Sequence, residues 1–170
     1  MKKFELTSEF VTFLGKKLFR IKALVSFGDV KEGELGGLVE KEENLDQSGN
    51  AWVSGNAWVS GDARVYGDAR VYGNAWVSGD ARVYGDAWVS GDARVQNCRD
   101  YSATSCFGSG NRTTTFFRTK DGGISVRCGC FYGTLAEFRE KVKERHGGRR
   151  LAKEYLMLAD LMEFRLSKDE

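Results

Sequence analysis

Proline is absent from this chain of 170 residues, histidine occurs once and methionine occurs three times. No apolar run approaches the roughly 20 residues that a membrane-spanning helix needs, so we expect no contact with a membrane. The first ten residues contain two lysines but no long apolar core, and we expect no signal peptide. A formal charge of +2 does not mark the whole molecule as a polyanion binder. These absences predict a cytoplasmic protein.

Cysteine is also scarce: the four thiols are Cys98, Cys106, Cys128 and Cys130. We expect Cys128 and Cys130 to lie on one face of a strand, because side chains alternate, and with the other two they could supply four zinc ligands. Neither pair has the Cys-x₂₋₄-Cys spacing of structural zinc sites. We therefore expect buried free thiols and no metal, and keep a zinc site as the alternative.

The abundant feature is a repeat of six residues, which occurs eight times between Ser48 and Val95. Each unit holds a glycine, an Asp or Asn, an alanine, a Trp or Arg and a valine at fixed offsets. A period of six is typical of a solenoid that adds one short strand and one corner per unit. We expect valine and alanine to point inward and glycine to form the corners.

The segments on either side of the repeat lack this period. We expect residues 1–27 to form a capping hairpin, with strands at Phe10–Leu14 and Leu18–Leu24 and a turn at residues 15–17. Residues 28–100 then form the solenoid, beginning with an irregular coil over residues 28–47. Residues 101–170 are predicted to form a separate βββαα domain. Its strands are expected at Tyr101–Phe107, Thr113–Arg118 and Ile124–Cys130, and its helices from Thr134 to Gly147 and from about Arg149 to Leu166.

The pattern Val-(Ser/Tyr)-Gly-(Asp/Asn)-Ala-(Trp/Arg) resembles the hexapeptide repeat of left-handed parallel β-helices. That resemblance implies three hexads per triangular coil, so that residues 18 apart lie over one another. The predicted fold is mainly β with a C-terminal α+β part: a left-handed parallel β-helix with an N-terminal hairpin cap, followed by the βββαα domain. The variable position then forms three outer columns: Trp52, Arg70 and Trp88; Trp58, Trp76 and Arg94; and Arg64 and Arg82, beside which Tyr66 stacks on Tyr84.

Tryptophan, tyrosine and arginine are enriched at interaction hot spots, so these ten residues are the predicted binding surface. In the first column we expect Arg70 to lie between two indoles as a cation–π ladder. Contact between copies in a homo-oligomer is our first interpretation of the columns. Intrinsic ladders that stabilise the solenoid surface come second, and binding of a foreign ligand comes third.

Enzymes that resemble this fold depend on histidine, as the base in acyltransferases and as metal ligands in γ-class carbonic anhydrases. The solenoid has none, and His146 lies at the predicted end of a helix, where it favours the helix dipole. We therefore expect that the protein is not an enzyme and that it has neither a catalytic residue nor a cofactor. A divergent transferase that uses Asp62, Asp68 and Asp80 is the alternative.

The predicted helices carry a modest excess of positive charge, with seven Lys or Arg and four Glu between residues 137 and 154. Such a surface could contact nucleic acid or an acidic partner. A solvated helix surface is the favoured interpretation. The residues of this basic patch are Arg139, Lys143, Arg149 and Arg150.

Residues 17–45 (KLFRIKALVSFGDVKEGELGGLVEKEENL) resemble the start of hexapeptide-repeat proteins of phages and prophages, and residues 113–155 resemble a small C-terminal module of such proteins. The resemblance implies a phage-type protein that acts inside a bacterial host cell. We expect a rigid, non-enzymatic, homo-oligomeric binding protein whose partner is a bacterial host macromolecule. The sharper hypothesis is an inhibitor of a bacterial immune system, an anti-CRISPR or other anti-defence protein that binds a host defence complex. A structural virion component is a further alternative.

Overall fold

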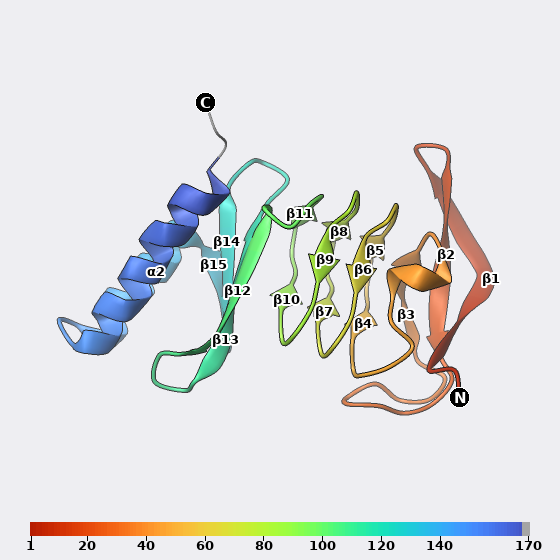
Figure 1. The fold of residues 1–170 in the computed structure, drawn as a ribbon, viewed down its shortest axis with the longest axis horizontal. Coiled ribbons are helices and arrows are strands. Elements are labelled where there is room, and N and C mark those ends of the chain that lie inside the picture. Colours follow the sequence, from red (N-terminus) through yellow and green to blue (C-terminus); the bar gives the residue numbers. More distant parts are fainter. Residues whose placement is uncertain (168–170) are drawn as a thin grey trace.

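The computed structural model describes residues 1–167 and is built around a β-solenoid (Figure 1). Each hexad contributes one strand of two residues, formed by the Trp or Arg position and the valine after it. Parallel pairing joins residues 18 apart, as in Trp52 with Arg70 and Arg70 with Trp88. The strands are β4 (Trp52–Val53), β5 (Trp58–Val59), β6 (Arg64–Val65), β7 (Arg70–Val71), β8 (Trp76–Val77), β9 (Arg82–Val83), β10 (Trp88–Val89) and β11 (Arg94–Val95).

The predicted register and core of the solenoid are confirmed. Every valine and alanine of the eight hexads has an exposed fraction of 0%. The hexad glycines have positive φ. At Gly79 no other residue fits, because φ is 62° and a Cβ would lie 2.2 Å from the carbonyl oxygen of Gln96. A repeated small residue therefore fixes the path of the chain at each corner.

The N-terminal segment extends one sheet of the solenoid. Strands β1 (Phe4–Phe13) and β2 (Lys16–Ala23) form an antiparallel hairpin, and β2 pairs with β3 (Leu35–Val39), which runs parallel to β5. The bounds of both strands differ from the prediction, because the turn that joins them consists of Leu14 and Gly15, both at positive φ, instead of residues 15–17. A two-residue turn of this kind lets pairing continue up to Phe13 and Lys16.

Residues 28–47 precede the regular coils, as expected, but they do not follow the 18-residue register. Val39 pairs with Val59 and Leu45 bridges to Val65, an offset of 20 in both cases. The two extra residues lie between Leu45 and Val53, because Val53 already pairs with Val71 at an offset of 18, and a short 3-10 helix, η1 (Glu42–Asn44), precedes them. The Asn44 side chain is buried and donates from Nδ2 to two backbone carbonyls of the coil above, those of residues 61 and 63.

The C-terminal part contains four strands instead of the predicted three. Its antiparallel sheet has the order β12 (Tyr101–Phe107), β13 (Arg112–Arg118), β14 (Ile124–Cys128) and β15 (Phe131–Thr134). Gly129, with φ of 59°, ends β14 and turns the chain into β15. Cys128 and Cys130 therefore lie on either side of a turn, and the prediction that they share one face of a strand is wrong.

Two helices follow, α1 (Leu135–His146) and α2 (Arg150–Leu166). The predicted capping box is present, since Thr134 Oγ1 accepts from Glu137 N at 3.2 Å and Glu137 Oε2 accepts from Thr134 N at 2.7 Å. Gly147 ends α1 with φ of 55°. No helix among residues 1–167 is long and apolar enough to cross a membrane.

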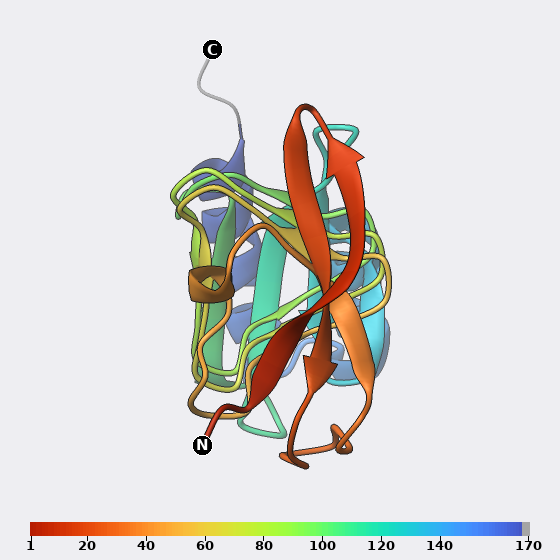
Figure 2. The same cartoon turned by 90° about the vertical axis from the view of Figure 1, so that its right-hand side faces the viewer.

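The C-terminal sheet lies between the last coil of the solenoid and the helices (Figure 1), and the view from the N-terminal side shows the coils stacked behind the hairpin (Figure 2). On one face, Tyr101 and Phe117 belong to the solenoid core. On the other face, Phe116 and Val126 pack with α1 and α2. The Tyr101 hydroxyl donates to the Arg82 carbonyl at 2.6 Å, which ties the sheet to the last coil.

Candidate functional site

The solenoid has three outer faces, and their surroundings in the folded chain differ. We call them the first face (Trp52, Arg70, Trp88), the second face (Trp58, Trp76, Arg94) and the third face (Arg64, Arg82, with Tyr66 and Tyr84 beside them). The predicted columns are present in all three, since each pairs residues 18 apart. What differs is how far other parts of the chain cover them.

The first face is largely covered by the N-terminal segment. Trp52 is 2% exposed, and its ring meets Phe4 and Phe27 edge-on at centroid distances of 6.4 and 5.4 Å. Arg70 forms an ion pair with Asp29. The expected ladder with Arg70 between two indoles is not formed: the carboxylate draws the guanidinium away, and the cation that lies over the Trp88 ring is Arg127, at 5.3 Å.

The second face is a packed ladder. The Trp58 and Trp76 ring centroids are 4.4 Å apart, and Phe13 of β1 lies edge-on against both, at 5.0 and 5.1 Å. The Arg94 guanidinium lies 3.7 Å from the centre of the Trp76 ring. Burial lowers the pKa of Arg94, and a guanidinium nevertheless stays charged in proteins, so we treat this group as a cation. Intrinsic stabilisation accounts for this column.

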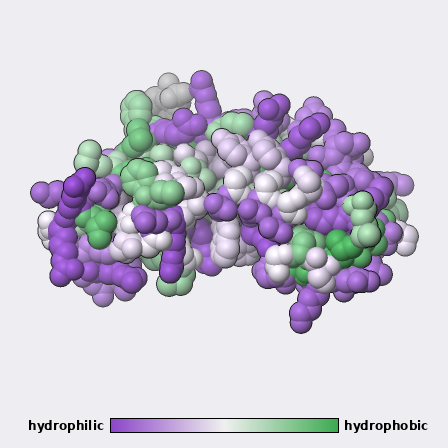
Figure 3. Space-filling model, turned by 60° about the horizontal axis from the view of Figure 1, so that its bottom comes forward, coloured by the Kyte–Doolittle hydropathy of each residue, from purple (hydrophilic) through white to green (hydrophobic). Residues whose placement is uncertain are grey.

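These contacts change the first interpretation of the tryptophans. Contact between copies was expected because four indoles on so small a solenoid need cover. Phe4, Phe13 and Phe27 supply that cover for three of them within one chain. Trp88, which is 41% exposed, is the one large exception. On the face drawn in Figure 3, hydrophobic residues gather in separate patches toward the two ends.

The third face is open. Arg64 and Arg82 are neighbours on β6 and β9, both side chains are exposed, and neither forms an ion pair with any residue among 1–167. Tyr66 and Tyr84 stack with centroids 5.4 Å apart and planes 14° apart, and Tyr84 is 53% exposed. The predicted tyrosine stack is thus confirmed, and it adds a flat aromatic step beside the two cations.

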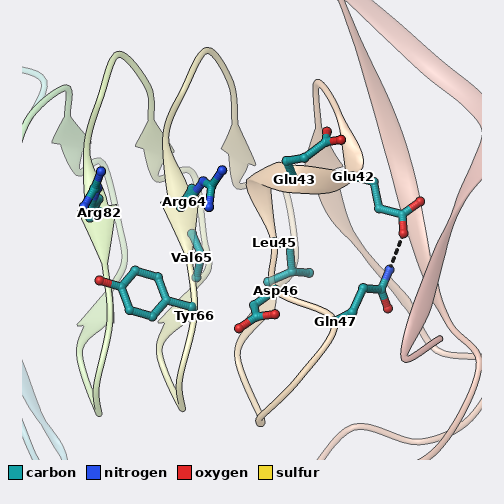
Figure 4. A pocket seen from close by; sticks show the side chains of 9 residues that line it. All are labelled: Glu42, Glu43, Leu45, Asp46, Gln47, Arg64, Val65, Tyr66 and Arg82. Carbon is teal, nitrogen blue, oxygen red and sulfur yellow. Dashed lines mark hydrogen bonds between the residues drawn. The ribbon is translucent and has the colours of Figure 1, made fainter. Parts of the chain in front are cut away.

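A groove of about 680 Å³ runs over this face (Figure 4). Arg64, Arg82 and Tyr66 form one part of it, and Glu42, Glu43 and Asp46 of the preceding segment form the other. Ion pairing with Lys2 lowers the pKa of Glu42, and the Ser48 backbone N–H lowers that of Asp46, so both carboxylates are ionised at neutral pH. The groove therefore presents positive, aromatic and negative groups in turn.

Sequence patterns did not reveal the acidic part of this groove. The run KEENLD was visible, but its position over the third face depends on the offset of 20. The hexad register alone would have placed these residues elsewhere. To predict where the acidic residues lie, one would have needed to know that Leu45, rather than another apolar residue, pairs with Val65.

The aspartates of the alternative transferase do not form one site. Asp62 and Asp80 share a column, whereas Asp68 lies one hexad further, on a different side of the coil. Asp62 pairs with Lys41 at 3.0 Å, which lowers the pKa of the carboxyl, and Asp68 accepts from Asn50 at 2.8 Å. A carboxylate held in its ionised form by a lysine is a weak base, so this residue gives the transferase no support.

The predicted basic patch is divided by ion pairs. Arg139 contacts Asp160 and Glu163, both at 2.7 Å, Lys143 pairs with a glutamate at 2.9 Å, and Arg150 pairs with another at 3.1 Å. Arg149 is exposed at the start of α2. The solvated helix surface was the favoured interpretation, and these pairs agree with it.

The cysteines are free, and the expectation that they are buried is wrong for three of the four. Cys98, Cys106 and Cys130 are exposed, and only Cys128 is half-buried. Cys98 lies in a loop, Cys106 lies in β12 at an irregularity of the pairing, where its φ is 62°, and Cys130 lies in the turn between β14 and β15; only this turn was hidden by the predicted strand boundaries. Within residues 1–167 no three His, Cys, Asp or Glu side chains are grouped as metal ligands would be.

Comparison with known proteins agrees with the fold. A family model described as the YdcK beta-solenoid repeat matches residues 63–79 and 75–91. Both segments lie in the regular coils, so the similarity concerns the solenoid and leaves the hairpin and the C-terminal sheet outside it. A search of curated proteins found no match to this chain.

Proposed function

We propose that this protein is a non-enzymatic binding protein whose third face engages a bacterial host protein. One observation carries the proposal: of the three ladders, this one keeps its cations unpaired within residues 1–167 and uncovered by the hairpin. Arginine and tyrosine supply charge, hydrogen bonds and flat apolar area, and such residues dominate binding energy when a partner desolvates them.

The charge pattern favours a protein over nucleic acid as the partner. A phosphate backbone is attracted by cations alone, and carboxylates beside them repel it. Here Glu42, Glu43 and Asp46 line the same groove as Arg64 and Arg82. Alternating signs are complementary to a protein surface that carries both charges, and they give specificity.

The finer parts of the proposal rest on sequence resemblance. They are a left-handed winding of the hexads, the hairpin as a cap, and a phage-type origin with action in the cytoplasm of a bacterial host. The sharper version makes the partner a component of a bacterial immune system, so that the protein acts as an anti-CRISPR or other anti-defence inhibitor. A rigid solenoid suits this role, because little surface must become ordered on binding.

The test is quantitative co-purification from bacterial lysate with the tagged full chain and the double variant Arg64→Glu/Arg82→Glu. The matched control is Arg99→Glu/Arg149→Glu, which changes charge equally at two exposed arginines away from the groove. We expect recovery of specific host proteins to fall at least tenfold with the groove variant and to stay within twofold with the control. Urea unfolding of each variant checks that the fold is intact.

Two outcomes would refute the proposal. The first is an identical set of captured proteins for wild type and groove variant. The second is capture of the same chain alone, in which case sedimentation would show that the third face joins copies of the protein. If the protein bound single-stranded DNA and the Arg64→Glu/Arg82→Glu variant weakened that binding equally, the partner of the third face would be a nucleic acid.

A further inference from the structure

The C-terminal part contains a second cavity, of about 540 Å³, which lies apart from the third face. Its walls come from the loop between β12 and β13 with the start of β13, from the turn between β14 and β15 with the start of β15, and from α1 and α2. Its volume falls within the range of small-molecule sites, which is about 300–1,000 Å³. Sequence patterns in this region indicate only a basic helix surface, a histidine at a helix end and two thiols.

Positive charge converges on this cavity without a matching negative group. Arg112 comes from β13, and Arg145 and His146 come from the end of α1. None of these three side chains has an ion pair within residues 1–167, and the cavity walls described there contain no Asp or Glu. A fourth cation, Lys141, is paired with Glu144 at 2.9 Å.

The helix dipole accounts for part of this arrangement, because basic residues in the last turn stabilise a helix end. It does not account for Arg112, which belongs to the sheet. Glycines on both sides make room for this arginine: a Cβ on Gly110 would lie 3.1 Å from its Nε, and one on Gly129 would lie 2.8 Å from its Nη1. The local backbone thus accommodates a guanidinium at the cavity.

The inner part of the cavity is aromatic. Phe138 and Tyr155 are 3% and 7% exposed, and their rings meet at 5.7 Å, with Phe131 5.6 Å from Phe138. His146 stacks on Tyr155 at 5.8 Å. Burial, reinforced by the neighbouring Cys128, raises the pKa of Tyr155 to about 12, and the charges of Arg145 and Arg112 oppose this rise. Both arginines therefore act on the same hydroxyl.

We propose that this cavity binds a small organic anion with a flat aromatic body, its acidic group held by Arg112 and Arg145 and its ring packed against the aromatic floor. The charge of the walls selects an anion, and two guanidiniums favour a carboxylate, sulfonate or phosphate ester. The apolar floor selects an aromatic body over a bare inorganic ion. This site is independent of the third face and of its protein partner.

The experiment titrates the full chain with 8-anilinonaphthalene-1-sulfonate, an aromatic sulfonate whose fluorescence rises on binding. The variant Arg112→Gln/Arg145→Gln is expected to weaken binding about 10- to 100-fold, because each charged hydrogen bond contributes substantially. The control Arg99→Gln/Arg149→Gln removes two exposed arginines elsewhere and should change binding less than twofold.

A thiol in the cavity wall reports where the probe binds. Cys130 lines this cavity and Cys98 does not, yet both are exposed. We expect the probe to slow alkylation of Cys130 by iodoacetamide at least fivefold and to leave Cys98 unaffected. Phenyl phosphate and benzoate are the competitors that distinguish a phosphate ester from a carboxylate, and inorganic phosphate tests charge alone.

Displacement of the probe by either aromatic competitor, together with protection of Cys130, supports the site and identifies its preferred acidic group. Three results would overturn the proposal: equal probe binding by the Arg112/Arg145 variant and wild type, an unprotected Cys130, or displacement by inorganic phosphate as readily as by phenyl phosphate. Failure of the third-face experiment leaves this result unaffected, since the tested arginines of the two sites are different residues.

Discussion

Replacing one central valine tests the packing on which the solenoid depends. Val71 is fully buried and lies between Val53 and Val89, its register partners in the coils on either side. Val71→Ala removes two methyl groups, worth about 1.6–2 kcal/mol in transfer free energy. A residual cavity of roughly 50 Å³ adds about 1 kcal/mol if the neighbours do not close in. We expect the free energy of unfolding to fall by about 2–3 kcal/mol.

The assay is urea unfolding followed by far-ultraviolet circular dichroism, with a lower midpoint and an unchanged slope as the expected result. Val11→Ala is the matched control, because Val11 is 44% exposed on β1 and should lose no more than about 0.5 kcal/mol. Equal losses at the two positions would refute the inference that buried, stacked valines stabilise the solenoid.

The opposite change separates packing from strand propensity. Ala69 is also fully buried, and Ala69→Val would raise β propensity. We nevertheless expect a loss of about 1–3 kcal/mol, because two additional methyl groups overfill the narrow interior. A more stable Ala69→Val variant would show that the interior has room to spare and that our account of alanine at this position is wrong.

Three further predictions concern side chains outside this core. Arg94→Gln should lower the free energy of unfolding by about 1–2 kcal/mol, because the guanidinium contacts the Trp76 ring and two carbonyls. Arg82→Gln should lower it by less than about 0.5 kcal/mol, because that side chain is exposed. Equal losses of stability in urea unfolding would contradict the difference between the second and third faces. Asn44→Leu should cost about 2–4 kcal/mol, since it leaves two carbonyls without their donor, and a neutral result in the same assay would refute that role. Burial lowers the pKa of Lys3 to about 8, so above pH 8 the folded state binds fewer protons than the unfolded state and stability from this residue rises with pH. The stability of wild type relative to Lys3→Met should therefore increase between pH 7 and 9.5, and a constant difference would exclude the depressed pKa.

The regular part of the fold followed from the sequence because it depends on local repetition. The inward residues and the corner glycines follow from the hexad, the 18-residue register is what the resemblance to hexapeptide β-helices implies, and the structure has each of them. The capping box at Thr134 and the stop at Gly147 are equally local signals, and they too are confirmed.

The remainder depends on contacts between distant segments, which no short pattern contains. Phe13 reaches Trp58 and Trp76 only because β1 and β2 extend the sheet through β3. Likewise, the neighbours of Gly129 predict a strand through this residue, whereas its positive φ forms a turn that leads into β15. The groove on the third face needed the offset of 20, and the cavity of the C-terminal part needed that turn.

The uniform stacking has a consequence for how such a chain can vary in length. Every coil of 18 residues presents the same valines, alanines and glycines to the next, and the hairpin and the C-terminal sheet cover opposite ends of the solenoid. Duplication of one coil between these ends would add the same contacts again and increase their separation by about 4.8 Å, the spacing of paired strands. The distance between the two terminal modules is thus adjustable in fixed increments, independently of what either module does.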